Sequence, residues 1–132
     1  MAIVFRLRRG DDLLEGIQRK VADEHISAGY VACCVGCVTH ARLRDASGVT
    51  VRELDERLEI VSLTGTVGEA RCHLHVSFSR EDLSTIGGHL MTGCIVNTTA
   101  EIVLERCDGL CFGKAFDPET GYDELVISQS MP

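Results

Sequence analysis

Polar and apolar side chains alternate along Cys72-His73-Leu74-His75-Val76-Ser77-Phe78-Ser79. This stretch predicts a β-strand, because successive side chains of a strand point to opposite faces of its sheet. His73 and His75 then share one face, with their Cβ atoms about 7 Å apart. Two imidazoles at that separation can bind one metal ion. The stretch that predicts a strand therefore also predicts a metal-binding site.

A third histidine follows in Gly87-Gly88-His89-Leu90. We expect Gly87 and Gly88 to form a turn that returns His89 to the face of His73 and His75. Three protein ligands with an open fourth position are the pattern of catalytic zinc sites, whereas structural sites are closed. The sequence therefore predicts a site at His73, His75 and His89 for a metal ion, zinc or another divalent transition metal, or for a small ligand. The alternative is that the three histidines are hydrogen-bonded at a subunit interface without metal.

Most of the remaining chain is also strand-like. Apolar or β-branched patterns predict strands near residues 3–8, 30–38, 58–66, 94–107, 110–116 and 125–127. We expect the segment 110–116 to pair with 94–107 across the turn residues Asp108 and Gly109.

One helix is predicted early in the chain. Leu13, Ile17 and Val21 recur at helical spacing after Asp12, which is a suitable N-cap residue. The expected fold is therefore α+β, with a mixed, largely antiparallel sheet and one N-terminal helix. With 132 residues, the chain suits a single domain over residues 1–132.

Composition narrows the classes of function. The formal net charge is −7, which disfavours a DNA-binding role because nucleic-acid binders carry a basic surface. The apolar runs are too short to cross a membrane, and we expect no membrane association. Residues 1–6 do not resemble a signal peptide, and the seven cysteines lie mostly in apolar runs as free thiols would. We therefore expect a cytoplasmic protein.

Several short motifs, taken in order, resemble the plant and prokaryote conserved domain, PPC or PCC, which accompanies AT-hooks in plant nuclear proteins. The matching stretches run over residues 3–107 and are Leu7-x-x-Gly10-x-Asp12-Leu13, Gly36-x-Val38 with Ala41-x-Leu43-Arg44, residues 58–66, His73-x-His75-x-Ser77, residues 87–90, and Thr98-Thr99-Ala100-Glu101. The chain is thus similar to a stand-alone prokaryotic member of this family.

The resemblance implies a homotrimer and the DNA-binding or regulatory role usually suggested for prokaryotic members. It also implies that prokaryotic members keep histidines at the positions of His75 and His89, which plant members largely lack. An AT-hook needs an Arg-Gly-Arg-Pro core, and this sequence contains none. A trimer would also carry three times the negative charge of one chain. DNA is therefore a disfavoured partner.

Catalysis at the predicted metal site would need a general base and hydrogen-bonding groups besides the three histidines. Glu101 is the candidate general base or partner of a ligating histidine, and Ser77 or Thr99 could add hydrogen bonds. A metal-dependent enzyme of unknown substrate using His73, His75 and His89 is the alternative to a non-enzymatic module, which the sequence favours. A third possibility is a trimeric scaffold without a ligand. Three arginines are candidates for binding an anion: Arg42, Arg44 and Arg71.

Overall fold

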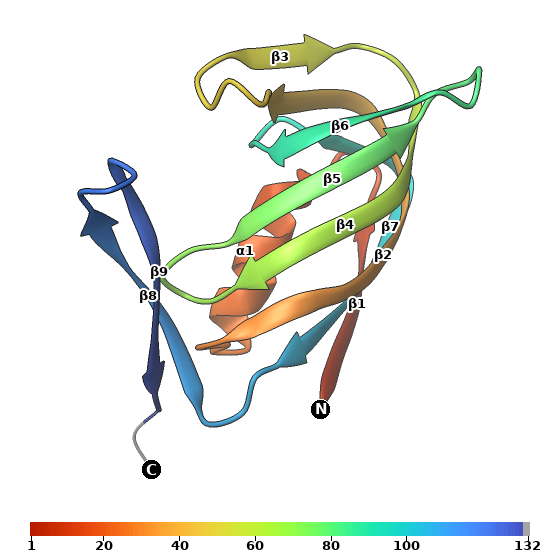
Figure 1. Ribbon diagram of the computed structural model, residues 1–132. Helices are drawn as coiled ribbons and strands as arrows, with labels where there is room; N and C mark the ends of the chain where they lie inside the picture. The colour runs from red at the N-terminus through yellow and green to blue at the C-terminus, as the bar shows by residue number, and fades with distance from the viewer. Residues whose placement is uncertain (131–132) are drawn as a thin grey trace.

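The computed structural model describes residues 1–130 and contains one seven-stranded sheet, one helix and a separate two-stranded hairpin (Figure 1). The elements in chain order are β1 (Ala2–Arg8), α1 (Leu13–Asp23), β2 (Gly29–Arg44), β3 (Val51–Leu54), β4 (Leu58–Val67), β5 (His73–Ser79), β6 (Thr85–Leu90), β7 (Ile95–Arg106), β8 (Leu110–Asp117) and β9 (Tyr122–Gln129). Each of the eight pairings between these strands is antiparallel. The predicted α+β class with one N-terminal helix is confirmed.

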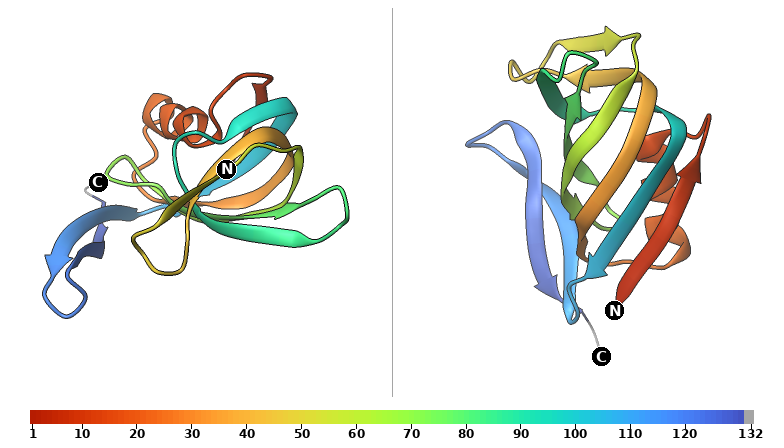
Figure 2. Two further views of the ribbon diagram at one scale, coloured as in Figure 1. Left: turned by 90° about the horizontal axis from the view of Figure 1, so that it is seen from above. Right: turned by 90° about the vertical axis from the view of Figure 1, so that its right-hand side faces the viewer.

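The large sheet curls around its longest strand, β2. The strand order is β1-β7-β2-β4-β5-β6, and β3 pairs with β2 outside this path. Near its end, β2 also pairs with β6, where Leu43 lies opposite Leu90 and Arg44 opposite His89. The sheet therefore bends back on itself, as the views in Figure 2 show. This curl places the end of β2 next to the histidine-bearing strands.

The helix covers the concave, apolar face of the sheet. Asp12 caps α1, and its carboxylate accepts a hydrogen bond from the backbone N–H of Glu15 at 3.0 Å. The apolar side of α1, formed by Leu13, Ile17 and Val21, is buried in the same core as the sheet residues. On β5 the core residues are Leu74, Val76 and Phe78, at alternate positions. The intervening side chains of β5 therefore point away from the core.

The predicted pairing of residues 110–116 with residues 94–107 is wrong. β7 already pairs with β1 along one edge and with β2 along the other, so it has no free edge for β8. Instead, β8 pairs with β9, with Leu110 opposite Gln129 and Asp117 opposite Tyr122. The hairpin stands beside the main sheet in Figure 1.

Three hydrogen bonds attach the β8–β9 hairpin to parts of the domain that are distant in sequence. The backbone N–H of Phe112 donates to the carbonyl oxygen of Ser27 at 2.9 Å, and the Ser27 hydroxyl donates to the carbonyl oxygen of Leu110 at 3.1 Å. Arg71 Nη1 donates to the carbonyl oxygen of Asp123 at 2.7 Å. These contacts fix the hairpin opposite the loop between β4 and β5.

Within residues 1–130, no helix has the length and apolar character needed to span a bilayer.

Candidate metal centre

Three histidines converge on the face of the sheet away from the core. His73 and His75 alternate with buried Leu74 and Val76 on β5, as the period of two requires. His89 comes from β6 and lies directly opposite His75 in the strand pairing. We call these three residues the histidine cluster.

The spacing within the histidine cluster suits one shared ion. Taking one ring nitrogen from each residue, the three ligand atoms all lie within 4.8 Å of one another. The ring centroids are 5.2 Å apart for His73 and His75, 5.2 Å for His73 and His89, and 5.5 Å for His75 and His89. Such rings can approach one central ion with small changes in side-chain torsion, because zinc–nitrogen bonds are about 2.0–2.1 Å long.

Gly87 and Gly88 lie within β6, so the turn predicted there is wrong. A Cβ at Gly87 would collide with the carbonyl oxygen of Val76, and a Cβ at Gly88 would lie 2.8 Å from the carbonyl oxygen of Arg44. The two glycines therefore allow β6 to pack closely between β5 and β2. His89 reaches the histidine cluster through strand pairing rather than through a turn.

Two of the three imidazoles are held in the neutral form that binds metals. Burial, assisted by the positive charge of Arg44, lowers the pKa of His89 to about 4. Burial and then the charge of Arg71 also lower the pKa of His73. In addition, His89 Nδ1 is buried and has no hydrogen-bond partner within residues 1–130. A buried ring nitrogen without a partner is expected where a ligand is to be bound.

The histidine cluster opens onto a cleft of about 490 Å³ between the sheet and the β8–β9 hairpin. His73 and His89 line its floor, and Arg44 and Arg71 lie beside them. Lys114 of β8 also lines the cleft. The other lining residues are Gly48, Cys72, Tyr122, Asp123 and Glu124. Any ion on the histidine cluster would therefore face a space large enough for a small molecule.

The structure does not bring Glu101 to the histidine cluster within one chain. Glu101 lies on β7 opposite Arg6 and Val35, and the strand order puts β7 three strands from β5. The β2–β6 pairing brings β7 within two strands of His89, but Glu101 lies opposite Val35 of β2, whereas His89 lies opposite Arg44, nine residues further along. Nine residues of a strand span about 30 Å. Thr99 is also on β7, where its hydroxyl accepts a hydrogen bond from Arg6 Nε at 2.9 Å. The catalytic role of Glu101 stays a prediction that a single chain does not support.

Ser77 is closer to the site. It follows His75 by two positions on β5 and pairs with Gly87 of β6, so it lies on the same face about 7 Å along the strand. It is placed to contact a ligand or a water molecule near His75 rather than the ion itself.

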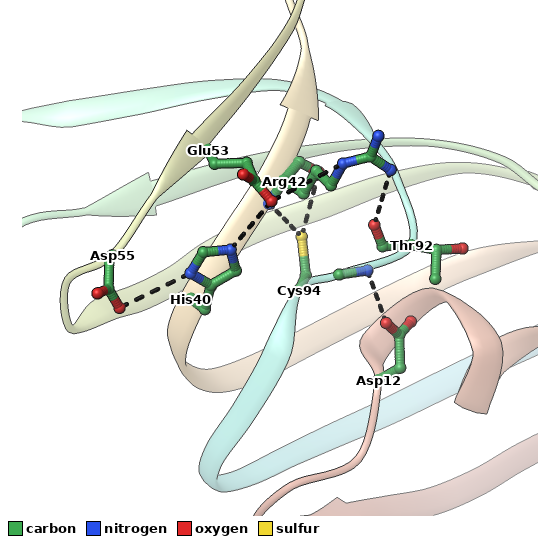
Figure 3. Close-up of polar contacts among 8 residues, drawn as sticks. Asp12, His40, Arg42, Glu53, Asp55, Thr92 and Cys94 are labelled. Carbon is green, nitrogen blue, oxygen red and sulfur yellow. Dashed lines mark hydrogen bonds and ion pairs between the residues drawn. The ribbon is translucent and has the colours of Figure 1, made fainter.

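The other charged residues around β2 are already paired, as Figure 3 shows. His40 lies 3.5 Å from a carboxylate oxygen of Glu53 and 3.7 Å from one of Asp55. Arg42 Nε lies 3.9 Å from the same Glu53 oxygen, and its Nη1 donates to the carbonyl oxygen of Thr92 at 3.4 Å. Of the three arginines named as candidates for binding an anion, Arg42 is already paired with Glu53, and Arg44 and Arg71 line the cleft.

Sequence reasoning missed the part of the cleft that comes from the hairpin. Lys114, Tyr122, Asp123 and Glu124 carry no spacing pattern relative to the histidines. They reach the cleft only because β8 and β9 pair with each other and are held against Ser27 and Arg71.

Two solved structures resemble this chain in both sequence and fold. A hypothetical protein from Salmonella cholerae-suis is 32% identical, covers 99% of this chain and 95% of its own, and has a TM-score of 0.96. A protein from Archaeoglobus fulgidus, described as metal-containing, is 28% identical over 96% of this chain and 93% of its own, with a TM-score of 0.81.

Other relatives carry different descriptions. A protein of Bacteroides thetaiotaomicron described as a candidate DNA-binding protein shares the fold, with a TM-score of 0.84 and 21% identity over 95% of this chain and 91% of its own. The bifunctional protein GlmU of Synechococcus sp. strain JA-2-3B'a(2-13) is 40% identical over 123 residues, or 93% of this chain. The chain spans only 20% of the length of that relative.

The family comparison covers the whole seven-stranded sheet, including both histidine-bearing strands. The profile of the Plants and Prokaryotes Conserved (PCC) domain matches residues 1–108, which include the whole histidine cluster and end before the β8–β9 hairpin. The match extends over far more than half of the 132 residues. The chain therefore belongs to the Plants and Prokaryotes Conserved domain family.

Proposed function

We propose that this chain is a metal-binding module of the PCC family in which His73, His75 and His89 bind one divalent transition metal ion, with zinc as the first candidate. The observation that carries the proposal is the convergence of three imidazole ligand atoms within 4.8 Å of one another. The lowered pKa values of His73 and His89 support it, since only neutral imidazole binds a metal ion. The description of the similar Archaeoglobus fulgidus protein as metal-containing agrees with it.

Three imidazoles leave at least one coordination position for water or a ligand oxygen. When bound there, zinc would act as a Lewis acid that polarises this oxygen. The residues of the chain would hold the ion, and the cleft would give a small molecule access to it. We favour a regulatory or ligand-binding role over catalysis, because Glu101, the general base predicted from the sequence, is not among the residues that line the cleft. Asp123 and Glu124 line it, and they are the carboxylates that the alternative, a metal-dependent enzyme using His73, His75 and His89, would use as a base.

We further propose a homotrimer. The sheet face away from α1 exposes apolar side chains on three different strands, namely Val4 on β1, Val35 on β2 and Val61 on β4. Each of these valines is more than half exposed in the single chain. The hairpin also exposes Phe116 and Ile127. Apolar surface distributed in this way supports burial between copies of the chain.

A DNA-binding role is less well supported than metal binding. Several basic side chains of the described residues are paired with carboxylates: Arg52 with Asp45, Arg57 with Glu81, Arg80 with Glu56, and Arg106 and Lys20 with the single carboxylate of Glu24. Phosphate contacts need unpaired cations, and the net charge of −7 adds a repulsive field.

Elemental analysis of the purified protein tests the metal proposal. Protein produced with added zinc should contain close to one metal ion per chain, and a His75→Ala/His89→Ala variant should contain almost none. A His25→Ala/His40→Ala variant is the matched control, because it removes two histidines outside the histidine cluster. Equal metal content in the wild type and the His75→Ala/His89→Ala variant would refute the proposal.

A further inference from the structure

The cleft next to the histidine cluster has two unlike walls. His73, His89 and Arg44 belong to the main sheet, and Lys114 and Tyr122 belong to the hairpin. The volume of about 490 Å³ is within the range of small-molecule sites, about 300–1,000 Å³. The space is too small for a folded partner and suits a metabolite-sized ligand.

Two positive charges beside the histidine cluster, Arg44 and Lys114, are not held in ion pairs within residues 1–130. Arg44 lies opposite His89 in the β2–β6 pairing, and its Nε is buried without a hydrogen-bond partner within residues 1–130. A buried guanidinium N–H without an acceptor is unfavourable, so an acceptor from outside the chain is expected at Arg44.

Other arginine-lined hollows of the surface differ in this respect. The cleft of about 460 Å³ near the end of β5 contains Arg57 and Arg80. There, Arg57 lies 2.6 Å from a carboxylate oxygen of Glu81, and Arg80 lies 2.9 Å from one of Glu56. The charges of Arg57 and Arg80 are therefore balanced by carboxylates of the chain. Arg44, in the cleft at the histidine cluster, has no such ion pair among the described residues.

The same cleft also contains groups that disfavour a multiply charged anion. Asp123 and Glu124 line it together with Tyr122. A dianion such as phosphate would meet repulsion from these carboxylates. A monoanion with hydroxyl groups would instead donate hydrogen bonds to them.

We infer that the cleft binds a small hydroxycarboxylate, whose carboxylate contacts Arg44 and Lys114 and whose hydroxyl end faces the histidine cluster and Glu124. Arginine binds a carboxylate through paired N–H donors, which gives Arg44 the larger share of the affinity. The inference deepens the proposed function, and rests on it only for the contact between a ligand oxygen and the metal ion. Arg44 and Lys114 are available whether or not a metal ion is bound.

Titration of the zinc-loaded protein with glycolate tests the inference, followed by calorimetry or by backbone amide NMR shifts. Glycolamide is the neutral control ligand and inorganic phosphate is the dianionic one. We expect saturable glycolate binding in the millimolar range or tighter, weak glycolamide binding, and phosphate binding weaker than that of glycolate. Arg44→Gln should weaken glycolate binding at least about tenfold. Lys114→Gln should weaken it less, and it alters an exposed side chain whose loss leaves the fold intact.

The matched control is Arg19→Gln, which removes the same charge from an exposed position on α1 that does not line the cleft. It should bind glycolate as the wild type does. Metal content measured on every sample separates the two proposals. If zinc is present in full and glycolate fails to bind, or binds equally to the wild type, Arg44→Gln and Lys114→Gln, the ligand inference is wrong and the metal proposal stands.

If the protein holds no zinc, the metal proposal fails and the same titrations are read on the metal-free protein. Glycolate binding that Arg44→Gln abolishes would then still support the ligand site. Phosphate binding tighter than that of glycolate would overturn the assignment to a monocarboxylate.

Discussion

His75 on β5 lies directly opposite His89 on β6, and their ring centroids are 5.5 Å apart. Because these residues are paired by the backbone of the sheet, their separation does not depend on a mobile loop. His73 adds a third imidazole from two positions along the same strand. The histidine cluster is therefore preorganised by strand register, which reduces the cost of binding an ion.

The stability of the metal-free protein should decrease in mild acid because of His89. Its pKa is about 4 in the folded chain and about 6.5 in an unfolded one. Between these values the unfolded chain binds a proton that the folded chain does not, so the free energy of unfolding falls as the pH falls from about 6.5 to about 4. Urea unfolding of the chelator-treated protein across this range should show the loss, and a His89→Gln variant should show a smaller one. Identical pH dependence in the two proteins would contradict this assignment.

Gly65 should be essential for the position of His73. It has φ = +146°, and a Cβ there would collide with the carbonyl oxygen of His73. Gly65→Ala should lower the free energy of unfolding by about 2 kcal/mol or more, from backbone strain and overpacking. Gly113→Ala is the control, since the nearest atom to its Cβ would be the carbonyl oxygen of Val126 at 3.9 Å, and we expect a change within about 0.5 kcal/mol. Equal effects of the two substitutions in urea unfolding would show that the close approach of β4 to β5 is not required.

The trimer should depend on the exposed valines of the sheet. Light scattering of the wild type should give three times the mass of the chain. Val35→Lys should give a single-chain mass, because an interface cannot bury an unpaired ammonium group. Val49→Lys changes an equally apolar but loop-located side chain that is 77% exposed, and it should remain trimeric. A monomeric wild type, or a trimeric Val35→Lys variant, would contradict the proposed interface.

Duplex DNA should not bind the protein appreciably. Paired arginines and a net charge of −7 leave little surface for phosphate contacts. Gel retardation and fluorescence anisotropy at low salt should show no complex at micromolar protein. A complex whose affinity falls steeply with added salt would show that the DNA-binding description of some relatives applies to this chain as well.

The sequence was sufficient to predict the strand character of β5 and the shared face of His73 and His75, since both follow from a period of two. It was not sufficient for β6. Gly87 and Gly88 are typical of a turn in local sequence, yet β6 uses them for close contact with Val76 and Arg44 on two neighbouring strands. That contact joins segments that are distant in sequence, so no local pattern contains it.

The partner of β8 illustrates the same limit. The Asp108-Gly109 pair predicts that β8 returns along β7, and this would hold if β7 had a free edge. Both edges of β7 are occupied by β1 and β2, which come from the beginning of the chain. The resulting hairpin with β9 brings Lys114 and Tyr122 to the histidine cluster, and this part of the cleft could be found only from the three-dimensional structure.

X-ray absorption spectroscopy at the zinc edge tests the central claim most directly, because the seven cysteines offer a competing set of ligands. Zinc on the histidine cluster should show nitrogen and oxygen neighbours at about 2.0–2.1 Å, with outer-shell scattering from three imidazole rings. The His75→Ala/His89→Ala variant should lose this signal. Sulfur neighbours at about 2.3 Å in the wild type, or an absence of imidazole scattering, would contradict the account.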